Sequence, residues 1–241
     1  SQSSKITQNI SGTFIGNKTA TYNGGAISLQ YDTKKSTISG TFINNQSWYG
    51  GAVSIYNSDT ASISGDFIQN KAEKYGGAVH VTGGNVDVID GNFYNNQSEV
   101  QGGAINITSR ATVGTIKGTF IGNSAQKDGV SGYIDMYGGA IALSQWSTSV
   151  GTINNSYFLN NYVTTTGAKA KGGAIGIFGS TRTESNKIST ISNTLFTGNY
   201  AVSENNKAEG GAIFIDENDN EYGAEIGEIL NSNFIDNYVK G

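Results

Sequence analysis

Short runs in which hydrophobic and polar residues alternate occur along the whole chain. In the run 78–81, Val79 and Val81 share one face, while His80 lies between them on the outward face. This period of two is typical of strands with one buried face, and no run shows the period of a capped helix. The pattern therefore predicts an all-β protein.

Two motifs repeat with this alternation. Gly-Gly-Ala followed by Ile or Val occurs seven times, and the first three steps are 26 residues each. Phe-x-x-Asn occurs eight times and alternates with the first motif without exception. The glycine pairs are Gly24 and Gly25, Gly50 and Gly51, Gly76 and Gly77, Gly102 and Gly103, Gly138 and Gly139, Gly172 and Gly173, and Gly210 and Gly211. The second motif comprises Phe14 and Asn17, Phe42 and Asn45, Phe67 and Asn70, Phe93 and Asn96, Phe120 and Asn123, Phe158 and Asn161, Phe196 and Asn199, and Phe234 and Asn237.

An isoleucine precedes each motif phenylalanine, by four residues in the first five repeats and by five in the last three. Glycine occupies the middle of the short gap, as in "ISGTF", and asparagine occurs in the long gap, as in "ISNTLF". Both residues accept left-handed backbone angles. We therefore expect two short strands that meet at a tight corner in every repeat.

Three short strands in about 25 residues predict one coil of a right-handed, single-stranded parallel β-helix, a pectin-lyase-like solenoid. The 241 residues give about seven to eight coils in one solenoid spanning 1–241, with regular short coils in 1–123 and loop-extended coils in 124–241. Stacking places equivalent residues above one another, so we expect an interior Phe column, an Asn column at one corner and glycine pairs at another. Long loops in the second half either form a binding side or are tolerated insertions.

Composition excludes several classes of protein. The net charge is −4, which argues against a nucleic-acid partner. The chain has no cysteine, so disulfides and thiolate metal sites are excluded. No apolar run is long enough to span a membrane as a helix, and nothing indicates a cofactor.

The alternation of "GGAI" or "GGAV" with Phe-x-x-Asn resembles the repeat of the chlamydial polymorphic outer-membrane proteins over nearly the whole chain. That resemblance implies a β-helical passenger segment of an autotransporter, secreted or held at the bacterial cell surface, with a role in cell adhesion and virulence. It also implies a host protein or glycan receptor as the partner. We expect the chain to be a segment of a longer passenger.

Aromatic residues supply the candidate ligand-binding positions. Rows of exposed aromatic rings form platforms for sugars or proteins, whereas stacked tyrosines can equally cover the ends of the core. Tyr49 and Tyr75 directly precede glycine pairs, and Tyr22 lies one residue further out. The candidates for ligand binding are Tyr137, Trp146, Tyr162, Tyr200 and Tyr238.

The residue after each motif phenylalanine is mostly apolar. Strict alternation would place this series outside as an apolar band, whereas a bend at the corner would place it inside.

Catalysis has little support in the sequence. Polysaccharide lyases and hydrolases of this architecture need clustered acids with an arginine or lysine. The two arginines, Arg110 and Arg182, belong to different coils, and His80 has no assignable partner. Asp216 and Asp219 are weak candidates for a metal site, in an acidic stretch that a solvated loop also explains.

The sequence thus favours a non-enzymatic adhesin segment. The alternative is a structural subunit that associates end to end into an extracellular fibre, because open strand edges pair with other chains. A polysaccharide-degrading enzyme is the least favoured hypothesis.

Overall fold

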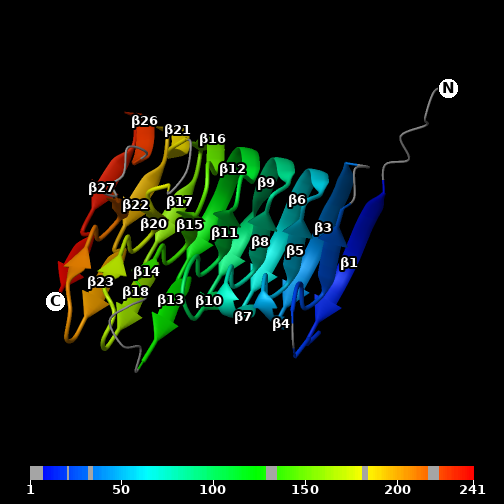
Figure 1. Ribbon diagram of the computed structural model, residues 1–241, viewed down its shortest axis with the longest axis horizontal. Helices are drawn as coiled ribbons and strands as arrows, with labels where there is room; N and C mark the ends of the chain where they lie inside the picture. Colours follow the sequence, from blue (N-terminus) through cyan, green and yellow to red (C-terminus); the bar gives the residue numbers. More distant parts are fainter. Residues whose placement is uncertain (1–7, 21, 32–34, 129–134, 181–183, 217–222) are drawn as a thin grey trace.

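The computed structural model describes residues 8–20, 22–31, 35–128, 135–180, 184–216 and 223–241, and the regular elements in this part are all strands. Parallel strands lie side by side along a rod, with β1 (Asn9–Ile15) at one end and β26 (Ala224–Leu230), β27 (Asn233–Ile235) and β28 (Tyr238–Lys240) at the other (Figure 1). The chain passes through β4 (Gln46–Tyr49), β5 (Val53–Tyr56) and β6 (Asp59–Ile68) in three different sheets, and then β7 (Lys71–Tyr75) pairs with β4. Stacked, parallel, in-register sheets of this kind are compatible with a parallel β-helix, as the sequence predicts.

Three sheets extend along the rod, and a small fourth sheet joins them in the second half. Sheet A contains β1 (Asn9–Ile15), β3 (Ser36–Ile43), β6 (Asp59–Ile68), β9 (Asn85–Tyr94), β12 (Thr112–Ile121), β16 (Ser149–Asn154), β17 (Tyr157–Leu159), β21 (Asn186–Ser192), β22 (Leu195–Thr197), β26 (Ala224–Leu230) and β27 (Asn233–Ile235). Sheet B contains β4 (Gln46–Tyr49), β7 (Lys71–Tyr75), β10 (Gln97–Ser98), β13 (Ser124–Lys127), β18 (Tyr162–Thr165), β23 (Tyr200–Ser203) and β28 (Tyr238–Lys240). Sheet C contains β2 (Ile27–Gln30), β5 (Val53–Tyr56), β8 (Val79–Thr82), β11 (Ile105–Thr108), β15 (Ile141–Ser144), β20 (Ile175–Ile177) and β25 (Ile213–Ile215). The fourth sheet contains β14 (Met136–Tyr137), β19 (Ala170–Lys171) and β24 (Ala208–Glu209).

The core is a set of residue columns. Each motif phenylalanine stacks on its equivalent in the next coil, with ring centroids 4.6–4.8 Å apart and ring planes within 7° of parallel. Phe42 to Phe196 in this column are fully buried. Isoleucine and valine side chains of sheets A and C fill the rest of the interior, and their burial removes apolar surface from water in every coil.

The motif asparagines form a hydrogen-bonded ladder at the corner between sheets A and B. At Asn96, the backbone N–H and the side-chain amide both donate to Asn123 Oδ1, at 3.0 and 2.9 Å. The same amide donates to the carbonyl oxygen of Phe67 at 2.8 Å. This pattern runs from Asn17 to Asn237, so the ladder satisfies polar groups that the turn would otherwise leave unpaired.

The glycine pairs lie at the bend between sheets B and C. Gly76 has φ +65°, in the left-handed region, and an added Cβ would overlap the carbonyl oxygen of Val79. At Gly77 the backbone angle is ordinary, but a Cβ would overlap the carbonyl oxygen of Gly103 in the next coil. The first glycine therefore permits the bend, and the second permits the close approach of coils.

One predicted corner is wrong in the first five repeats. The glycine of the short gap does not divide the strand, because Gly40 lies inside the continuous strand β3. Gly40 does adopt a positive φ of 143°, as expected for a glycine, and a Cβ there would overlap the carbonyl oxygen of Gly12. This glycine therefore permits both the backbone angle and the close packing between coils. In the last three repeats the predicted corner is present, and Asn155, Asn193 and Asn231 adopt φ of 46–49° between separate strands.

The longer loops of the second half add structure of their own. The inserts are the extended segments 124–137 and 162–171, and residues of these segments form β14 and β19. Met136 of β14 and Ala170 of β19 pack in a second, smaller hydrophobic cluster. That cluster includes Met136, Ala168 and Ala170 together with Val163 of β18. These parts of the inserts are therefore packed against the rod and against each other.

Candidate functional site

The residues that directly precede the glycine pairs form a column along the rod. Pairing places Asn23, Tyr49, Tyr75, Gln101, Tyr137, Lys171 and Glu209 in register. Side chains from this column lie over the outer face of sheet C, opposite to the face that packs in the core. The Tyr49 and Tyr75 rings stack on His80 of β8, with centroids 5.3 and 6.1 Å apart. In the second half, Tyr137 contacts Phe178 and Phe214.

In the first half, this face holds a groove of about 310 Å³. Tyr22, Tyr49, Tyr56 and Tyr75 line it, together with His80 and with asparagine, threonine, serine and glutamine side chains. Tyr22 is 68% exposed, which leaves its ring open to solvent.

The surroundings of the groove extend its aromatic surface. The Tyr22 ring lies 6.4 Å from the ring of Trp48. The Lys74 Nζ lies 5.1 Å from the centre of the Trp48 ring, within the range of a cation–π contact.

His80 differs from the exposed residue that the sequence suggests. Its side chain does point away from the core, since its strand neighbours Val79 and Val81 belong to the core. The tyrosines cover it, however, and it is only 4% exposed. Burial lowers the pKa of the imidazole to about 4 and outweighs the opposing effect of the Asn106 side chain. His80 is therefore neutral at physiological pH.

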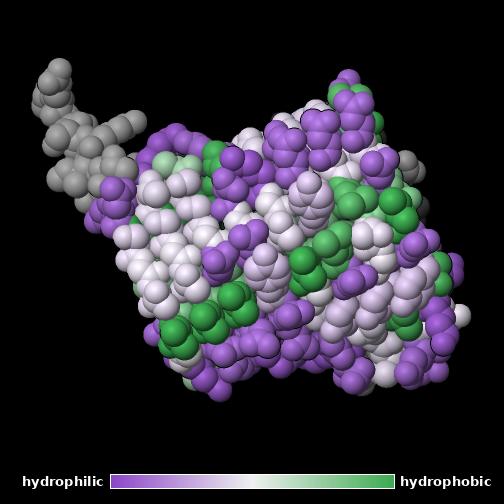
Figure 2. Space-filling view, turned by 180° about the vertical axis from the view of Figure 1, so that it is seen from behind, coloured by the Kyte–Doolittle hydropathy of each residue, from purple (hydrophilic) through white to green (hydrophobic). Residues whose placement is uncertain are grey.

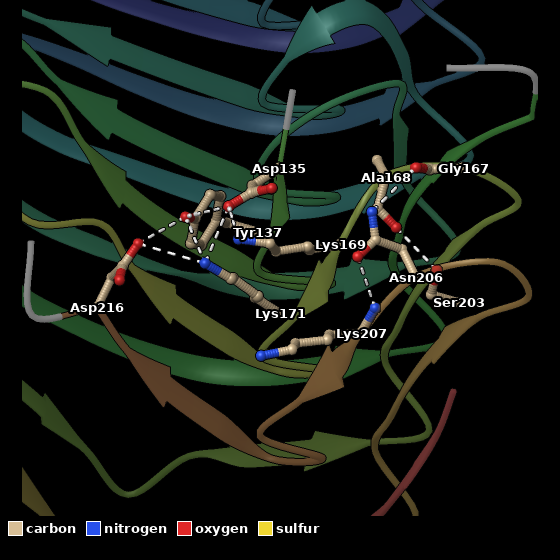
Figure 3. A network of polar contacts seen from close by, with 10 residues as sticks. All are labelled: Asp135, Tyr137, Gly167, Ala168, Lys169, Lys171, Ser203, Asn206, Lys207 and Asp216. Carbon is tan, nitrogen blue, oxygen red and sulfur yellow. Dashed lines mark hydrogen bonds and ion pairs between the residues drawn. The ribbon is translucent and has the colours of Figure 1, made fainter. Parts of the chain in front are cut away.

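In the second half, the column forms a buried polar network (Figure 3). Lys171 Nζ lies 2.9 Å from Asp135 Oδ2 and 3.4 Å from Asp216 Oδ2, and its side chain is 5% exposed. The Tyr137 hydroxyl donates to Asp216 Oδ2 at 2.7 Å. The Lys171 ammonium also lies 4.8 Å from the centre of the Phe214 ring. The network joins residues of three successive coils.

This network changes the interpretation of two candidates. Tyr137 is 1% exposed, so it is not part of an exposed platform, because its side chain lies over sheet C. Burial, followed by the hydrogen bond to Asp216, raises the pKa of its hydroxyl. Asp216 forms an ion pair with Lys171, while its proposed metal partner Asp219 lies outside the described residues. The described residues hold no cluster of three or more potential acidic, histidine or cysteine metal ligands.

Tyr162, Tyr200 and Tyr238 form a ladder on sheet B. The centroids of successive rings are 5.0 Å apart, and their planes lie within 11° of parallel. Tyr162 and Tyr200 are half-buried, and Tyr238 is 50% exposed. Desolvation by burial raises the pKa of Tyr200, followed by the effects of its two tyrosine neighbours. The three rings present a continuous aromatic edge to solvent.

The fifth aromatic candidate, Trp146, does not join this ladder. It is half-buried beyond the end of β15, and its carbonyl oxygen accepts the Arg110 backbone N–H at 2.7 Å. Arg110 and Trp146 thus lie in neighbouring coils, whereas Arg182 lies outside the described residues.

The residues after the motif phenylalanines lie outside the core. They are in register and none is buried, so alternation decides their direction; the series is Ile15, Ile43, Ile68, Tyr94, Ile121, Leu159, Thr197 and Ile235. On the face seen in Figure 2, hydrophobic side chains gather in groups among polar ones.

No protein-family model, curated protein or solved structure matches this chain. The described residues contain no helix with the length and apolar character needed to cross a membrane.

Sequence reasoning identified the tyrosine columns but missed the groove and the Lys171 network. Lys171 directly precedes Gly172, as Tyr137 precedes Gly138, so an alignment of the repeats would have paired them. His80 gave no such signal, because the rings that cover it come from two other strands, β4 and β7.

Proposed function

We propose that this chain is a cell-surface or secreted adhesin segment, a passenger that presents aromatic side chains on a rigid rod. The observation that carries the proposal is the partly exposed ladder of Tyr162, Tyr200 and Tyr238. Tyrosine is enriched in binding surfaces because its ring contributes contact area and its hydroxyl contributes a hydrogen bond. The in-register sheets hold these rings in place before a host protein or glycan arrives, which lowers the entropic cost of binding.

We further infer a right-handed β-helix of about seven to eight coils, one for each copy of the sequence motifs. Successive strands of each sheet are parallel, and crossover connections between parallel strands are nearly always right-handed. The proposed extracellular setting is that of the resembled passenger repeats.

The burial and ion pairing of the clustered charged groups favour a binding function without catalysis. Lys171 lies between Asp135 and Asp216 in ion pairs, with its side chain almost fully buried. Groups held in this way join coils together and are poorly placed to exchange protons with a substrate. We propose that they stabilise the rod.

The test combines an array of host proteins and glycans with assays for depolymerisation of polysaccharides. We expect binding without new reducing or unsaturated sugar ends. Replacing Tyr162 and Tyr200 together by alanine should weaken binding at least about tenfold. The control is Tyr157→Ala, which removes an exposed tyrosine from sheet A. Steady release of new sugar ends would overturn the proposal in favour of an enzyme.

A second candidate function is that of a fibre subunit. The Phe stack and the Asn ladder repeat by translation along the rod, so a further coil with the same motifs can continue both. Electron microscopy distinguishes the two functions, because an adhesin segment gives separate rods, whereas a subunit gives filaments with the rod length as their axial repeat.

A further inference from the structure

The groove on sheet C has an unusual combination of aromatic rings and uncharged polar groups. Four tyrosines line it, and the nearly buried His80 and Thr108 belong to the same lining. Among its described lining residues, none has a carboxylate, ammonium or guanidinium group. Such a surface offers aromatic rings and neutral hydrogen-bonding groups to a ligand. The Lys74 ammonium is outside the lining, with its Nζ 5.8 Å from the centre of the Tyr49 ring.

One detail indicates a ligand with polar groups. The Nδ1 atom of His80 is buried and has no hydrogen-bond partner among the described residues. Buried polar atoms are usually paired, so this unpaired nitrogen beneath the tyrosine rings favours a polar ligand group that displaces the rings enough to reach it. Two further lining residues bond each other, since Ser109 Oγ donates to Gln145 Oε1 at 2.6 Å, and this fixes both polar side chains.

We propose that this groove binds a neutral oligosaccharide, whose sugar rings stack on Tyr22, Tyr49 and Tyr75 and whose hydroxyl groups bond the surrounding polar side chains. The face of a sugar ring carries C–H groups that pack on the negative face of an aromatic ring. The low pKa keeps His80 neutral, so it places no positive charge beneath the stacking rings.

An extended peptide that adds a strand fits this site less well. Strand β8 beneath the groove is already paired on both sides, with β5 and with β11. A peptide therefore finds no open strand edge here, and main-chain hydrogen bonds of that kind are not available to it.

The inference names a ligand class for the proposed binding function and rests on it, but it concerns a different site from the tyrosine ladder of sheet B. The probes are cellohexaose, maltohexaose and chitohexaose, with hexagalacturonate as the acidic comparison and a proline-rich peptide as the non-sugar comparison. Binding to the full chain is measured by titration calorimetry.

We expect at least one neutral hexasaccharide to bind. Tyr22→Ala should weaken its binding at least about fivefold, because the exposed Tyr22 ring contributes to stacking. This variant tests the site without disturbing the core, whereas Tyr75→Ala should have a larger effect but also uncovers His80. The control Tyr157→Ala removes an exposed tyrosine from sheet A and should leave sugar affinity unchanged.

Three results would overturn the inference. They are the absence of binding to every neutral sugar, equal sugar affinity of Tyr22→Ala and the unchanged chain, and binding of only the acidic sugar or only the peptide. If the groove binds no sugar, the adhesin function is judged separately. It is supported if host-cell or receptor binding is lost in the Tyr162 and Tyr200 double variant and kept in Tyr22→Ala.

Discussion

At the scale of single residues, His80 shows how the outer face of a sheet can still be buried. The side chain points out of β8, yet the rings of Tyr49 and Tyr75 cover it from the adjoining corner. Its neutral form is favoured because the covered site excludes water from the imidazolium. The cost of protonation there links the stability of the rod to pH.

Stability should therefore decrease on acidification in a way that depends on His80. The folded pKa of about 4 lies below the unfolded value of 6.5, so the unfolded chain binds the proton more readily between these values. The contribution of neutral His80 to the free energy of unfolding should be fully present above pH 6.5. This contribution should be lost progressively as the pH falls toward 4. Between pH 7 and pH 5 we expect a loss of about 2 kcal/mol.

Chemical denaturation at a series of pH values measures this loss. His80→Asn removes the only histidine. It introduces the residue type that the next coil already has at the equivalent position, Asn106. Its stability should vary less over the same pH range. If both proteins show the same pH dependence, the burial of His80 has no such effect.

At the scale of elements, the asparagine ladder joins each strand turn to the next. Interior members such as Asn96 accept two hydrogen bonds from the previous asparagine and donate to the next one. Asn17 at the first coil only donates, to Asn45 Oδ1. The same residue type therefore contributes unequally along the rod.

Asn96→Ala should destabilise the protein by roughly 3 kcal/mol, because it leaves the Asn70 N–H buried without a partner and removes the hydrogen bonds that the Asn96 amide donates to Phe67 and Asn123. The matched variant Asn17→Ala loses one side-chain hydrogen bond at an exposed position, and we expect a cost below about 1 kcal/mol. Urea denaturation of the two variants compares them directly. Equal costs would show that the ladder does not act as a connected element.

At the scale of the whole molecule, the rod is a linear series of contacts between neighbouring coils. Sheets A, B and C each pair a strand mainly with its equivalents in the adjacent coils. In repeat architectures of this kind, stability is close to a sum of coil and interface contributions. A local defect should therefore weaken its surroundings more than the distant end.

Gly77→Ala tests this expectation, because the added Cβ would overlap the carbonyl oxygen of Gly103. We expect a loss of roughly 3 kcal/mol and faster hydrogen exchange in β7 to β11, with a decreasing effect toward β22. The control Gly16→Ala meets open space and only a positive φ of 65°, so its cost should be about 1 kcal/mol without spreading. Uniform acceleration of exchange along the rod would contradict the linear description.

The sequence by itself determined the columns of this protein. Phe67 lies on Phe42 because a fixed repeat places equal positions above one another at the spacing of paired strands. The same reasoning holds for Asn70 on Asn45 and for Gly77 on Gly51. These contacts need only the period of the motif and the size of the side chain.

Contacts between unlike positions were decided only by the tertiary structure. Whether Gly40 ends or continues a strand depends on how closely the neighbouring coil approaches. The meeting of Tyr75 with His80, and of Lys171 with Asp216, depends on where a corner directs its side chains and which strand lies beneath them. A repeat period contains no information on these directions, which is why the column was predictable from the sequence and the groove was not.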